Sequence, residues 1–369
     1  MPDASSSATS SLPRERRTLC FTGARAVTCI TEPCPVPGPG QVLMETARTL
    51  ISTGTELTVY TRNFAPGTHW DEWAKYPFFT GYLAAGKVVA VGPGVTGWAL
   101  GDRIASRTNH TSHALLNVAD AGQATAVLDC TPAPRGCRIP DGVPDEAACW
   151  MGLGKIVQVG VRAAEHVLGD VVVVIGLGLL GQLTVQYARL SGAARVIAID
   201  TAPLRLDLAR RHGATDVISG TASEAAAQVR AIAASHGLDG ADVVYDVTGH
   251  HSVLAQALPL ARRFGKVVLL GDPGDPSRQT LTPDVITRGV RIVAAHDGHP
   301  PQSPNPWVRW SSEQMSEQVL AWLAQGGLRT ASLVTHRFTP EQATEAYTLL
   351  DTKRNEAMGV VFTWDTAAG

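Results

Sequence analysis

The chain has 369 residues with a formal net charge of -2, and hydrophobic residues make up 44% of it. A chain of this length predicts two domains rather than one. The near-neutral charge and the lack of a Lys/Arg run exclude a basic surface for nucleic acid. A membrane span is excluded as well, because the longest apolar stretch, residues 171–183, is short and interrupted by glycines. The composition predicts an ordinary soluble globular protein.

Serine and alanine are frequent in the first seventeen residues, which lack an apolar core. This composition predicts a disordered tail over residues 1–17 rather than a signal peptide, and a cytoplasmic location follows. The cysteines are scattered without a CxxC pair, so free thiols and no zinc site are expected. They are Cys20, Cys29, Cys34, Cys130, Cys137 and Cys149.

Short β-prone segments separated by proline and glycine characterise the chain up to about residue 150. They predict strands at residues 41–47, 86–91, 102–105 and 112–118. Toward the end of the chain we expect a helix near 313–325, a strand over 333–338, a helix from Pro340 and a strand over 358–362. These late elements are expected to complete the first domain, which then comprises residues 18–149 and 296–369.

Residues 150–295 have a different rhythm, in which apolar strands alternate with helices rich in alanine, leucine and arginine. The strands begin near Val171, Val196, Val243 and Val267. This alternation predicts an α/β domain with a doubly wound parallel sheet.

A glycine pattern at the end of the first of these strands predicts dinucleotide binding. Gly176 permits a tight turn, Gly178 lets the backbone approach a pyrophosphate, and Gly181 allows close packing of helix on strand. The phosphates then lie at a helix N-terminus, where the backbone N–H groups of Leu179 and Leu180 have no partner within the helix.

The second strand ends in Asp200, at the offset that the dinucleotide pattern requires. An acid there accepts hydrogen bonds from the adenosine ribose and repels a 2′-phosphate, which favours NAD as the cofactor over NADP. Arg205 leaves an alternative open, because its cation can pair with a phosphate or lie along the adenosine.

Several short motifs in sequence order resemble the medium-chain dehydrogenase/reductase superfamily, which includes alcohol, sorbitol and threonine dehydrogenases. They occupy residues 37–43, 81–88, 91–95, 101–105, 176–181 and 213–218. The resemblance begins near Thr18 and implies a GroES-like β-rich catalytic domain, completed by the C-terminal segment, with an inserted Rossmann domain. It also implies cofactor contacts at Thr248, Gly249 and Gly271, and a homodimer or homotetramer formed by edge-to-edge pairing of Rossmann sheets.

The sequence departs from the zinc-dependent members of this family at the positions of the metal ligands. Those members have a cysteine where this chain has Thr53, a His-Glu pair where it has Tyr82 and Leu83, and a second cysteine near Leu153. The four-cysteine lobe that holds a structural zinc is missing as well. The chain therefore predicts a zinc-independent enzyme without a metal site, which needs another group for the hydroxyl proton.

Glu56 and Tyr82 are two candidates for handling this proton. Glu56 stands where the family has an acid beside the metal; the alternative is a domain-closing salt bridge with an arginine. Tyr82 can hydrogen-bond the substrate oxygen, or it can simply fill the vacant metal cavity.

Lys155 and His296 are the other two candidates. Lys155 is expected to begin the helix under the nicotinamide and to act as an acid/base or stabilise an alkoxide; a phosphate or carboxylate contact is the alternative. His296 follows the last Rossmann strand and suits a proton relay, with His299 as its partner or as a surface residue. The polar residues 109–113 are expected to have a structural role.

The substrate is expected to be a polyhydroxylated small molecule. The proline-rich loop 300–310 carries Trp307, whose ring suits the apolar face of a sugar, and Thr53 and His299 are further candidate substrate contacts. Residues 52–56 resemble family branches that act on sugars, cyclitols and tailoring-pathway substrates.

The expected activity is interconversion of a secondary alcohol and a ketone on a sugar-like, cyclitol or aminoglycoside-type molecule, in natural-product biosynthesis. Two alternatives remain: an NADPH-dependent quinone or enone reductase, and a non-catalytic NAD(H)-binding protein.

Overall fold

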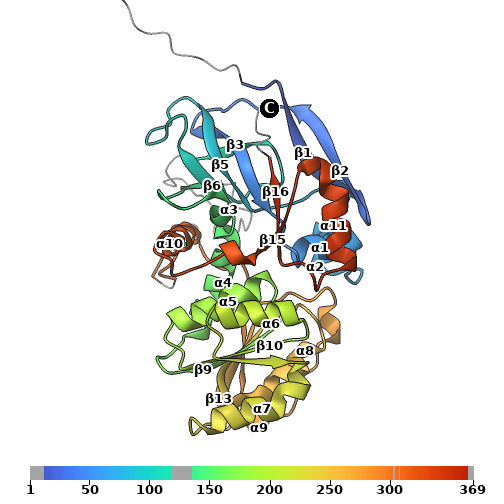
Figure 1. Cartoon of the computed structure of the whole chain (residues 1–369), viewed down its shortest axis with the longest axis vertical. Coiled ribbons are helices and arrows are strands. Elements are labelled where there is room, and N and C mark those ends of the chain that lie inside the picture. The colour runs from blue at the N-terminus through green and yellow to red at the C-terminus, as the bar shows by residue number, and fades with distance from the viewer. Residues whose placement is uncertain (1–11, 119–134, 302–303, 307, 365–369) are drawn as a thin grey trace, which may run out of the picture.

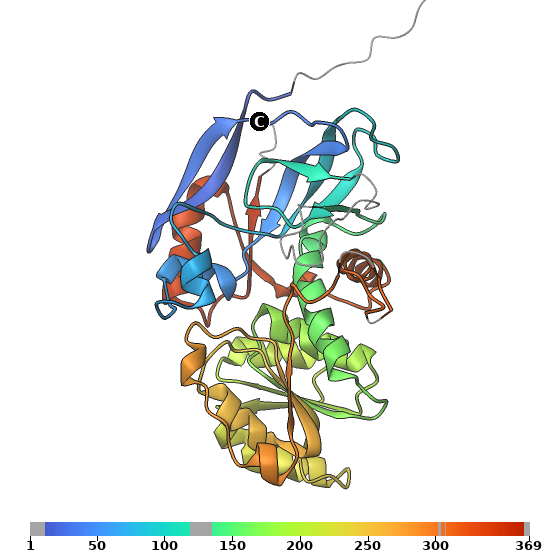
Figure 2. The ribbon, with the colours of Figure 1, turned by 180° about the vertical axis from the view of Figure 1, so that it is seen from behind.

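The computed structural model describes residues 12–118, 135–301, 304–306 and 308–364. A β-rich domain and a parallel-sheet domain lie end to end, with helix α4 (Met151–Ala164) between them (Figure 1). Figure 2 shows the same two domains from behind. Among the helices in these described ranges, none is long and apolar enough to cross a membrane.

The parallel-sheet domain contains six strands in the order β11-β10-β9-β12-β13-β14, and every neighbouring pair is parallel. Its strands are β9 (Val171–Ile175), β10 (Arg195–Asp200), β11 (Asp216–Ser219), β12 (Ala241–Asp246), β13 (Ala261–Leu269) and β14 (Arg291–Ala294). The helices around it are α5 (Leu179–Leu190), α6 (Pro203–Arg211), α7 (Ala222–Ala234), α8 (Val253–Ala257) and α9 (Asp284–Thr287), with 3₁₀ turns η1 (Leu258–Leu260) and η2 (Pro276–Arg278). The strand order reverses between β9 and β12, which opens a crevice at their carboxyl ends.

The β-rich domain contains a seven-stranded sheet, in which β7 pairs with β3 beside the path β15-β16-β3-β5-β6-β8, and a small sheet β2-β1-β4. Its strands are β1 (Glu15–Gly23), β2 (Ala26–Pro33), β3 (Gln41–Leu50), β4 (Phe78–Phe79), β5 (Ala84–Val91), β6 (Arg103–Ser106), β7 (His113–Asn117), β8 (Gly136–Arg138), β15 (Val334–Phe338) and β16 (Gly359–Thr363). Its helices are α1 (Thr55–Thr61), α2 (His69–Trp73), α3 (Asp145–Ala148), α10 (Ser312–Ala324) and α11 (Ala343–Thr352), with 3₁₀ turns η3 (Ala331–Leu333) and η4 (Pro340–Gln342).

The C-terminal strand β16 pairs antiparallel with β3, so the end of the chain closes the sheet that its first part begins. In Figure 1 this is the contact between the red and blue strands of the upper domain. The predicted fold class, a GroES-like β-rich domain plus a Rossmann domain, is confirmed by this architecture.

Two local predictions were wrong. Strand β1 already begins at Glu15, inside the stretch expected to be a disordered tail, because Glu15 pairs with Pro33 and the Arg16 guanidinium reaches Glu32 at 3.2 Å. Cross-strand pairing thus orders a sequence that is too polar to indicate a strand. Helix α4 begins at Met151 rather than at Lys155, so Lys155 lies within its second turn.

Candidate active site

The glycine pattern after β9 forms an open cradle at the crevice. Gly176 has a φ of 86°, and a Cβ on Gly181 would stand 2.0 Å from the carbonyl oxygen of Gly176. A Cβ on Gly178 would meet no heavy atom within 4 Å, so the backbone there faces open space. Gly178 is also the N-cap of α5 and offers no capping side chain, which leaves the N–H groups of Leu179 and Leu180 directed at this space. This geometry suits an anion such as a pyrophosphate.

The loops after β12 and β13 close the same edge of the sheet. A Cβ on Gly271 would stand 2.3 Å from the backbone nitrogen of Gly249, and a Cβ on Gly176 would stand 2.8 Å from the Thr248 side chain. Thr248 is fixed by a 2.7 Å hydrogen bond to Asp246. The predicted positions 176, 248, 249 and 271 therefore converge, although they are far apart in sequence.

Asp200 ends β10 and is buried at the rim of this cradle. Its two carboxylate oxygens accept hydrogen bonds from the backbone N–H groups of Leu177 at 2.7 Å and Ala202 at 2.8 Å. Arg205 lies alongside, with Nη1 3.7 Å from the Asp200 carboxylate and Nη2 donating to the Arg354 carbonyl at 3.0 Å. Each Asp200 oxygen retains a lone pair that can accept a ribose hydroxyl.

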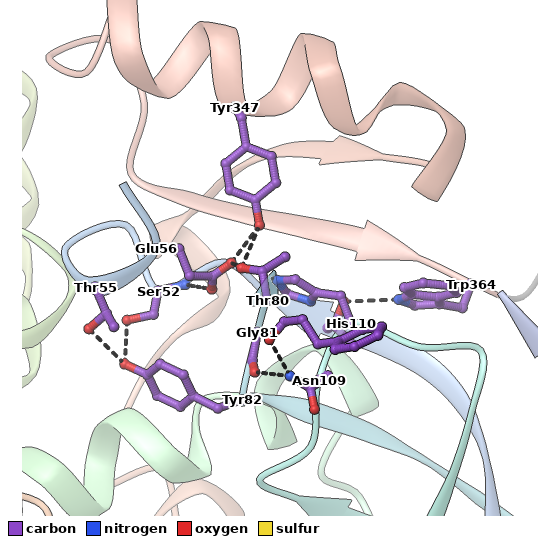
Figure 3. A network of polar contacts seen from close by, with 12 residues as sticks. Ser52, Thr55, Glu56, Thr80, Gly81, Tyr82, Asn109, His110, Tyr347 and Trp364 are labelled. Carbon is purple, nitrogen blue, oxygen red and sulfur yellow. Dashed lines mark hydrogen bonds and ion pairs between the residues drawn. The ribbon is translucent and has the colours of Figure 1, made fainter. Parts of the chain in front are cut away.

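Glu56 belongs to a sealed network within the β-rich domain (Figure 3). One carboxylate oxygen accepts the Ser52 backbone N–H at 2.7 Å, and the other accepts the hydroxyls of Thr80 at 2.7 Å and Tyr347 at 2.5 Å. His110 Nε2 lies 3.0 Å from that second oxygen. Burial raises the pKa of Glu56, but the His110 charge and the hydrogen bonds from His110, Tyr347 and Thr80 outweigh burial and lower it.

The environment of Glu56 differs from both expectations drawn from the sequence. Its partner is a histidine of the same domain rather than a domain-closing arginine, and the carboxylate is only 1% exposed. His110 is itself enclosed, since a Cβ on Gly81 would stand 2.6 Å from its ring. This network joins α1, α11 and the loops at Thr80 and His110.

Tyr82 fills the space beside this network and turns its hydroxyl toward α1 (Figure 3). The phenol oxygen lies 2.5 Å from the Ser52 hydroxyl and 3.3 Å from the Thr55 hydroxyl. The Arg107 guanidinium lies over the other side, 5.0 Å from the ring centroid. Burial raises the pKa of Tyr82, so the phenol is neutral and can donate or accept a hydrogen bond.

Lys155, Asp297 and Arg107 form a charged cluster where the two domains meet. Lys155 is 1% exposed, and its Nζ donates to the Asp297 carboxylate at 2.6 Å and to the Asp297 carbonyl at 2.8 Å. Arg107 Nη1 donates to the other carboxylate oxygen of Asp297. Burial lowers the pKa of Lys155, with a further contribution from Arg107, although Asp297 opposes the shift.

The positions that correspond to the family's zinc ligands do not fit a metal ion. Leu83 and Leu153 are each 1% exposed, and a Cβ on Gly152 would stand 2.5 Å from the Leu83 side chain. Thr53 and Tyr82 offer only neutral hydroxyls, which are poor zinc ligands. Within the described ranges, no three His, Cys, Asp or Glu side chains are grouped to hold a metal.

His296 and His299 lie together on an exposed turn that follows β14. His296 Nδ1 accepts the Gly298 backbone N–H at 3.1 Å, and the two imidazole rings are 5.9 Å apart. The loop beyond them includes Trp310, whose ring is stacked under the Arg162 guanidinium at 3.8 Å. Trp307, expected to contact the substrate, lies outside the described residues.

Sequence reasoning overlooked several residues of this site. Ser52 and Thr55 lie inside a segment that was singled out for its neighbours, so their hydroxyls had a local signal. His110 lies in the polar segment 109–113, for which a structural role was expected, although its partner Glu56 was not. Arg107 and Tyr347 had no such signal, because their partners lie 190 and 291 residues away along the chain.

Comparison with known proteins agrees with this architecture. Residues 38–128 match the alcohol dehydrogenase GroES-like domain, and residues 180–313 match the zinc-binding dehydrogenase family. The L-threonine 3-dehydrogenase of Bacillus licheniformis is 29% identical over 317 residues, which cover 80% of this chain and 84% of that enzyme.

Two solved structures show the same fold. The 2R,3R-butanediol dehydrogenase of Bacillus subtilis has a TM-score of 0.75 at 18% identity, covering 94% of this chain and 99% of its own. The alcohol dehydrogenase rspB of Escherichia coli CFT073, determined with NADH, has a TM-score of 0.74 at 18% identity, covering 95% and 100%. The chain belongs to the medium-chain dehydrogenase/reductase superfamily and is an oxidoreductase of the alcohol dehydrogenase type.

Proposed function

We propose that this protein is a zinc-independent, NAD(H)-dependent oxidoreductase that interconverts a secondary alcohol and a ketone on a polyhydroxylated substrate. The observation that carries the proposal is the polar cluster at the domain junction. Lys155 and Arg107 both reach Asp297, Arg107 stacks on Tyr82, and Tyr82 stands at a position that the family resemblance assigns to a zinc ligand. The apolar contact between Leu83 and Gly152 supports a site without zinc.

The cofactor site is proposed from the glycine cradle and Asp200. The free N–H groups at the start of α5 suit the pyrophosphate, and the lone pairs of Asp200 suit the ribose hydroxyls of NAD. A 2′-phosphate would meet the Asp200 carboxylate, which favours NAD over NADP. When bound, the cofactor supplies a hydride acceptor for alcohol oxidation and a hydride donor for ketone reduction.

Lys155 is the proposed acid/base. Oxidation removes a hydride from the carbinol carbon and a proton from its hydroxyl, and the free Lys155 amine accepts that proton. Burial favours the neutral amine, while Asp297 fixes the position of Nζ through two hydrogen bonds. In the reverse direction the ammonium form returns the proton to the carbonyl oxygen.

Tyr82 is proposed to orient the reacting oxygen. Its neutral phenol stands between Arg107, which shares the Asp297 carboxylate with Lys155, and the Ser52 and Thr55 hydroxyls, so it can donate to an alkoxide or carbonyl. Glu56 and His110 are assigned a structural role, because their charges compensate each other inside the network. His296 is not assigned a proton, because its ring lies on an exposed turn.

A polyhydroxylated substrate without a cationic group is favoured. The L-threonine 3-dehydrogenase relatives support only the alcohol chemistry, because L-threonine carries a secondary hydroxyl but also an ammonium group. The nearby acids already have cationic partners: Asp71 pairs with Arg62 at 2.8 Å, and Asp297 pairs with Lys155. An aminoglycoside-type cation would therefore find no free carboxylate among them.

A homodimer formed at the edge strand β14 is proposed as the assembly. Strand β14 ends the parallel sheet, and most of its residues are exposed. The apolar side chain of Ile292 on this strand is 37% exposed, and that of Ile286 nearby in sequence is 86% exposed.

The activity is tested by following the reduced-nicotinamide absorbance while enzyme and NAD are mixed with a panel of polyols, sugars and cyclitols. The reverse assay uses NADH or NADPH with ketones and simple enones. We expect NAD reduction by a secondary alcohol. Consumption of NADPH by an enone, with no alcohol oxidised, would overturn the proposal in favour of a double-bond reductase.

A further inference from the structure

The charged cluster at the domain junction contains two cations and one anion. Asp297 is the carboxylate that both Lys155 and Arg107 reach, and its pKa is held below its usual value, because the two cations outweigh the effect of burial. The neighbouring Glu56 does not compensate the second cation, because it is paired with His110. With Lys155 protonated, the cluster therefore carries an excess positive charge in a partly enclosed site.

Lys155 can remove its own charge, but Arg107 cannot. Burial favours the neutral amine of Lys155, whereas a guanidinium remains protonated throughout the physiological range. When Lys155 is neutral, Arg107 and Asp297 balance each other. During ketone reduction Lys155 carries its proton, and the excess charge returns.

Arg107 leaves one edge of its guanidinium without a partner among the described residues. Nη1 is engaged by Asp297, and the flat face lies on Tyr82 at 5.0 Å. Nε is buried and has no hydrogen-bond partner within the described part of the chain, while 27% of the whole side chain is exposed. Nε and Nη2 form the edge with which arginine binds a carboxylate or phosphate through two parallel hydrogen bonds. An unpaired buried N–H is unfavourable, and such a ligand would supply its hydrogen-bond partner.

We propose that Arg107 recognises an anionic group on the substrate, so that the enzyme acts on phosphorylated polyols or sugar acids in preference to neutral polyols. Ion pairing with Asp297 and stacking on Tyr82 hold the guanidinium in place. The anion binds the unpaired edge of Arg107, which places the adjacent secondary hydroxyl near Lys155. When Lys155 carries its proton, during ketone reduction, the anion also compensates the excess positive charge. This inference rests on the proposed function, because it assigns the substrate class of the same site.

The test compares matched substrates on the full-length protein. Calorimetry in the presence of NADH measures binding of a polyol, its monophosphate and the corresponding sugar acid, for a series of chain lengths. The kcat/KM for NAD reduction is measured on the same compounds. The variants are Arg107→Gln, Arg107→Lys and, as a control, Arg138→Gln. Arg138 also stacks on an aromatic ring, Trp98, at 4.4 Å, but its ion-pair partner is Asp102, at 2.8 Å, rather than Asp297.

We expect the wild-type protein to bind one anionic class at least about tenfold more tightly than the neutral polyols. Arg107→Gln should reduce this ratio toward one, Arg107→Lys should keep part of it, and Arg138→Gln should leave it intact. Preference for the phosphate over the acid, or the reverse, identifies the anion.

Equal binding of neutral and anionic compounds by the wild-type protein would overturn the inference. So would an anion preference that persists in Arg107→Gln. Neither result contradicts the proposed alcohol dehydrogenase activity. That proposal is contradicted only if no secondary alcohol of any class reduces NAD.

Discussion

Two buried charged clusters lie close together in this protein, and they differ in how their charges are balanced. In the Glu56 network, one carboxylate faces one histidine, and further hydroxyl and backbone donors saturate its oxygens. In the Lys155 cluster, one carboxylate faces two cations. Each cluster has one buried nitrogen without a hydrogen-bond partner among the described residues, Nε of Arg107 and Nδ1 of His110, so the clusters differ in their charges. A sealed and balanced cluster stabilises the fold, whereas an unbalanced cluster at a domain junction is suited to a ligand or a moving proton.

The strongest way to break this comparison is to remove the proposed acid/base. Lys155→Met should slow hydride transfer by about a hundredfold or more, because the hydroxyl proton loses its acceptor. Single-turnover absorbance measurements of NAD reduction give this rate, and cofactor affinity should change little.

Lys266→Met is the matched control, because Lys266 is another largely buried lysine with a carboxylate partner, Glu165 at 2.9 Å. Lys266 lies in β13 and contacts the C-terminal end of α4 at Ala164, rather than Asp297. If both variants were equally fast, or equally slow, Lys155 would not be the acid/base.

Substitutions in the Glu56 network should change the stability of the fold rather than the rate of hydride transfer. Glu56→Gln should lower the free energy of unfolding by about 3 kcal/mol, because it removes one partner of a buried pair and leaves His110 without its counter-charge. Urea titration measures the change. Asp351→Asn, which removes an exposed ion pair with Arg25, should lower the free energy of unfolding far less. A small effect for Glu56→Gln would contradict the structural assignment.

The pH dependence of stability should separate the two clusters further. Because the pKa of Glu56 is lowered in the folded protein, the unfolded chain binds this proton at higher pH than the folded protein does. The contribution of Glu56 to the free energy of unfolding is therefore fully present above the unfolded pKa and is lost as the pH falls through the folded pKa. The lowered pKa of Lys155 makes stability rise with pH between the folded value and the ordinary value of 10.5.

Unfolding titrations of the wild type, Glu56→Gln and Lys155→Met across acid and alkaline pH test these signs. The difference from wild type should vanish in acid for Glu56→Gln, and it should vary on the alkaline side for Lys155→Met. Flat differences for both variants would contradict the two environments.

A smaller effect is expected at the cofactor rim. Asp200→Asn should reduce the preference for NAD over NADP by about tenfold, since it removes the charge that accepts ribose hydroxyls and repels a 2′-phosphate. Asp216→Asn, in the next strand and paired with Arg195 at 2.6 Å, is the control. Fluorescence titration with both cofactors measures the ratio, and an unchanged ratio for Asp200→Asn would remove that residue from its role.

The sequence predicted the two-domain fold and the glycine cradle because both depend on local patterns. Strand and helix periodicity is visible within about ten residues, and Gly176, Gly178 and Gly181 lie within six positions of one another. The bounds of β1 could not be predicted, because its order comes from pairing with β2 rather than from its own composition.

The two clusters could be predicted only in part. Lys155, Glu56 and Tyr82 were singled out as chemical groups, but their partners come from distant segments. Glu56 contacts Tyr347, 291 residues away in sequence, and Lys155 contacts Asp297, 142 residues away. No local sequence pattern therefore shows that Glu56 is enclosed in a hydrogen-bond network while Lys155 lies in the charged cluster at the domain junction. That difference depends on tertiary packing.

The most direct test of the central claim, hydride transfer without zinc, is the rate of NAD reduction by the preferred alcohol before and after treatment with a chelator, together with the metal content of the purified protein. The account predicts no stoichiometric zinc and an unchanged rate. One tightly held zinc per chain, whose removal abolishes turnover, would contradict it.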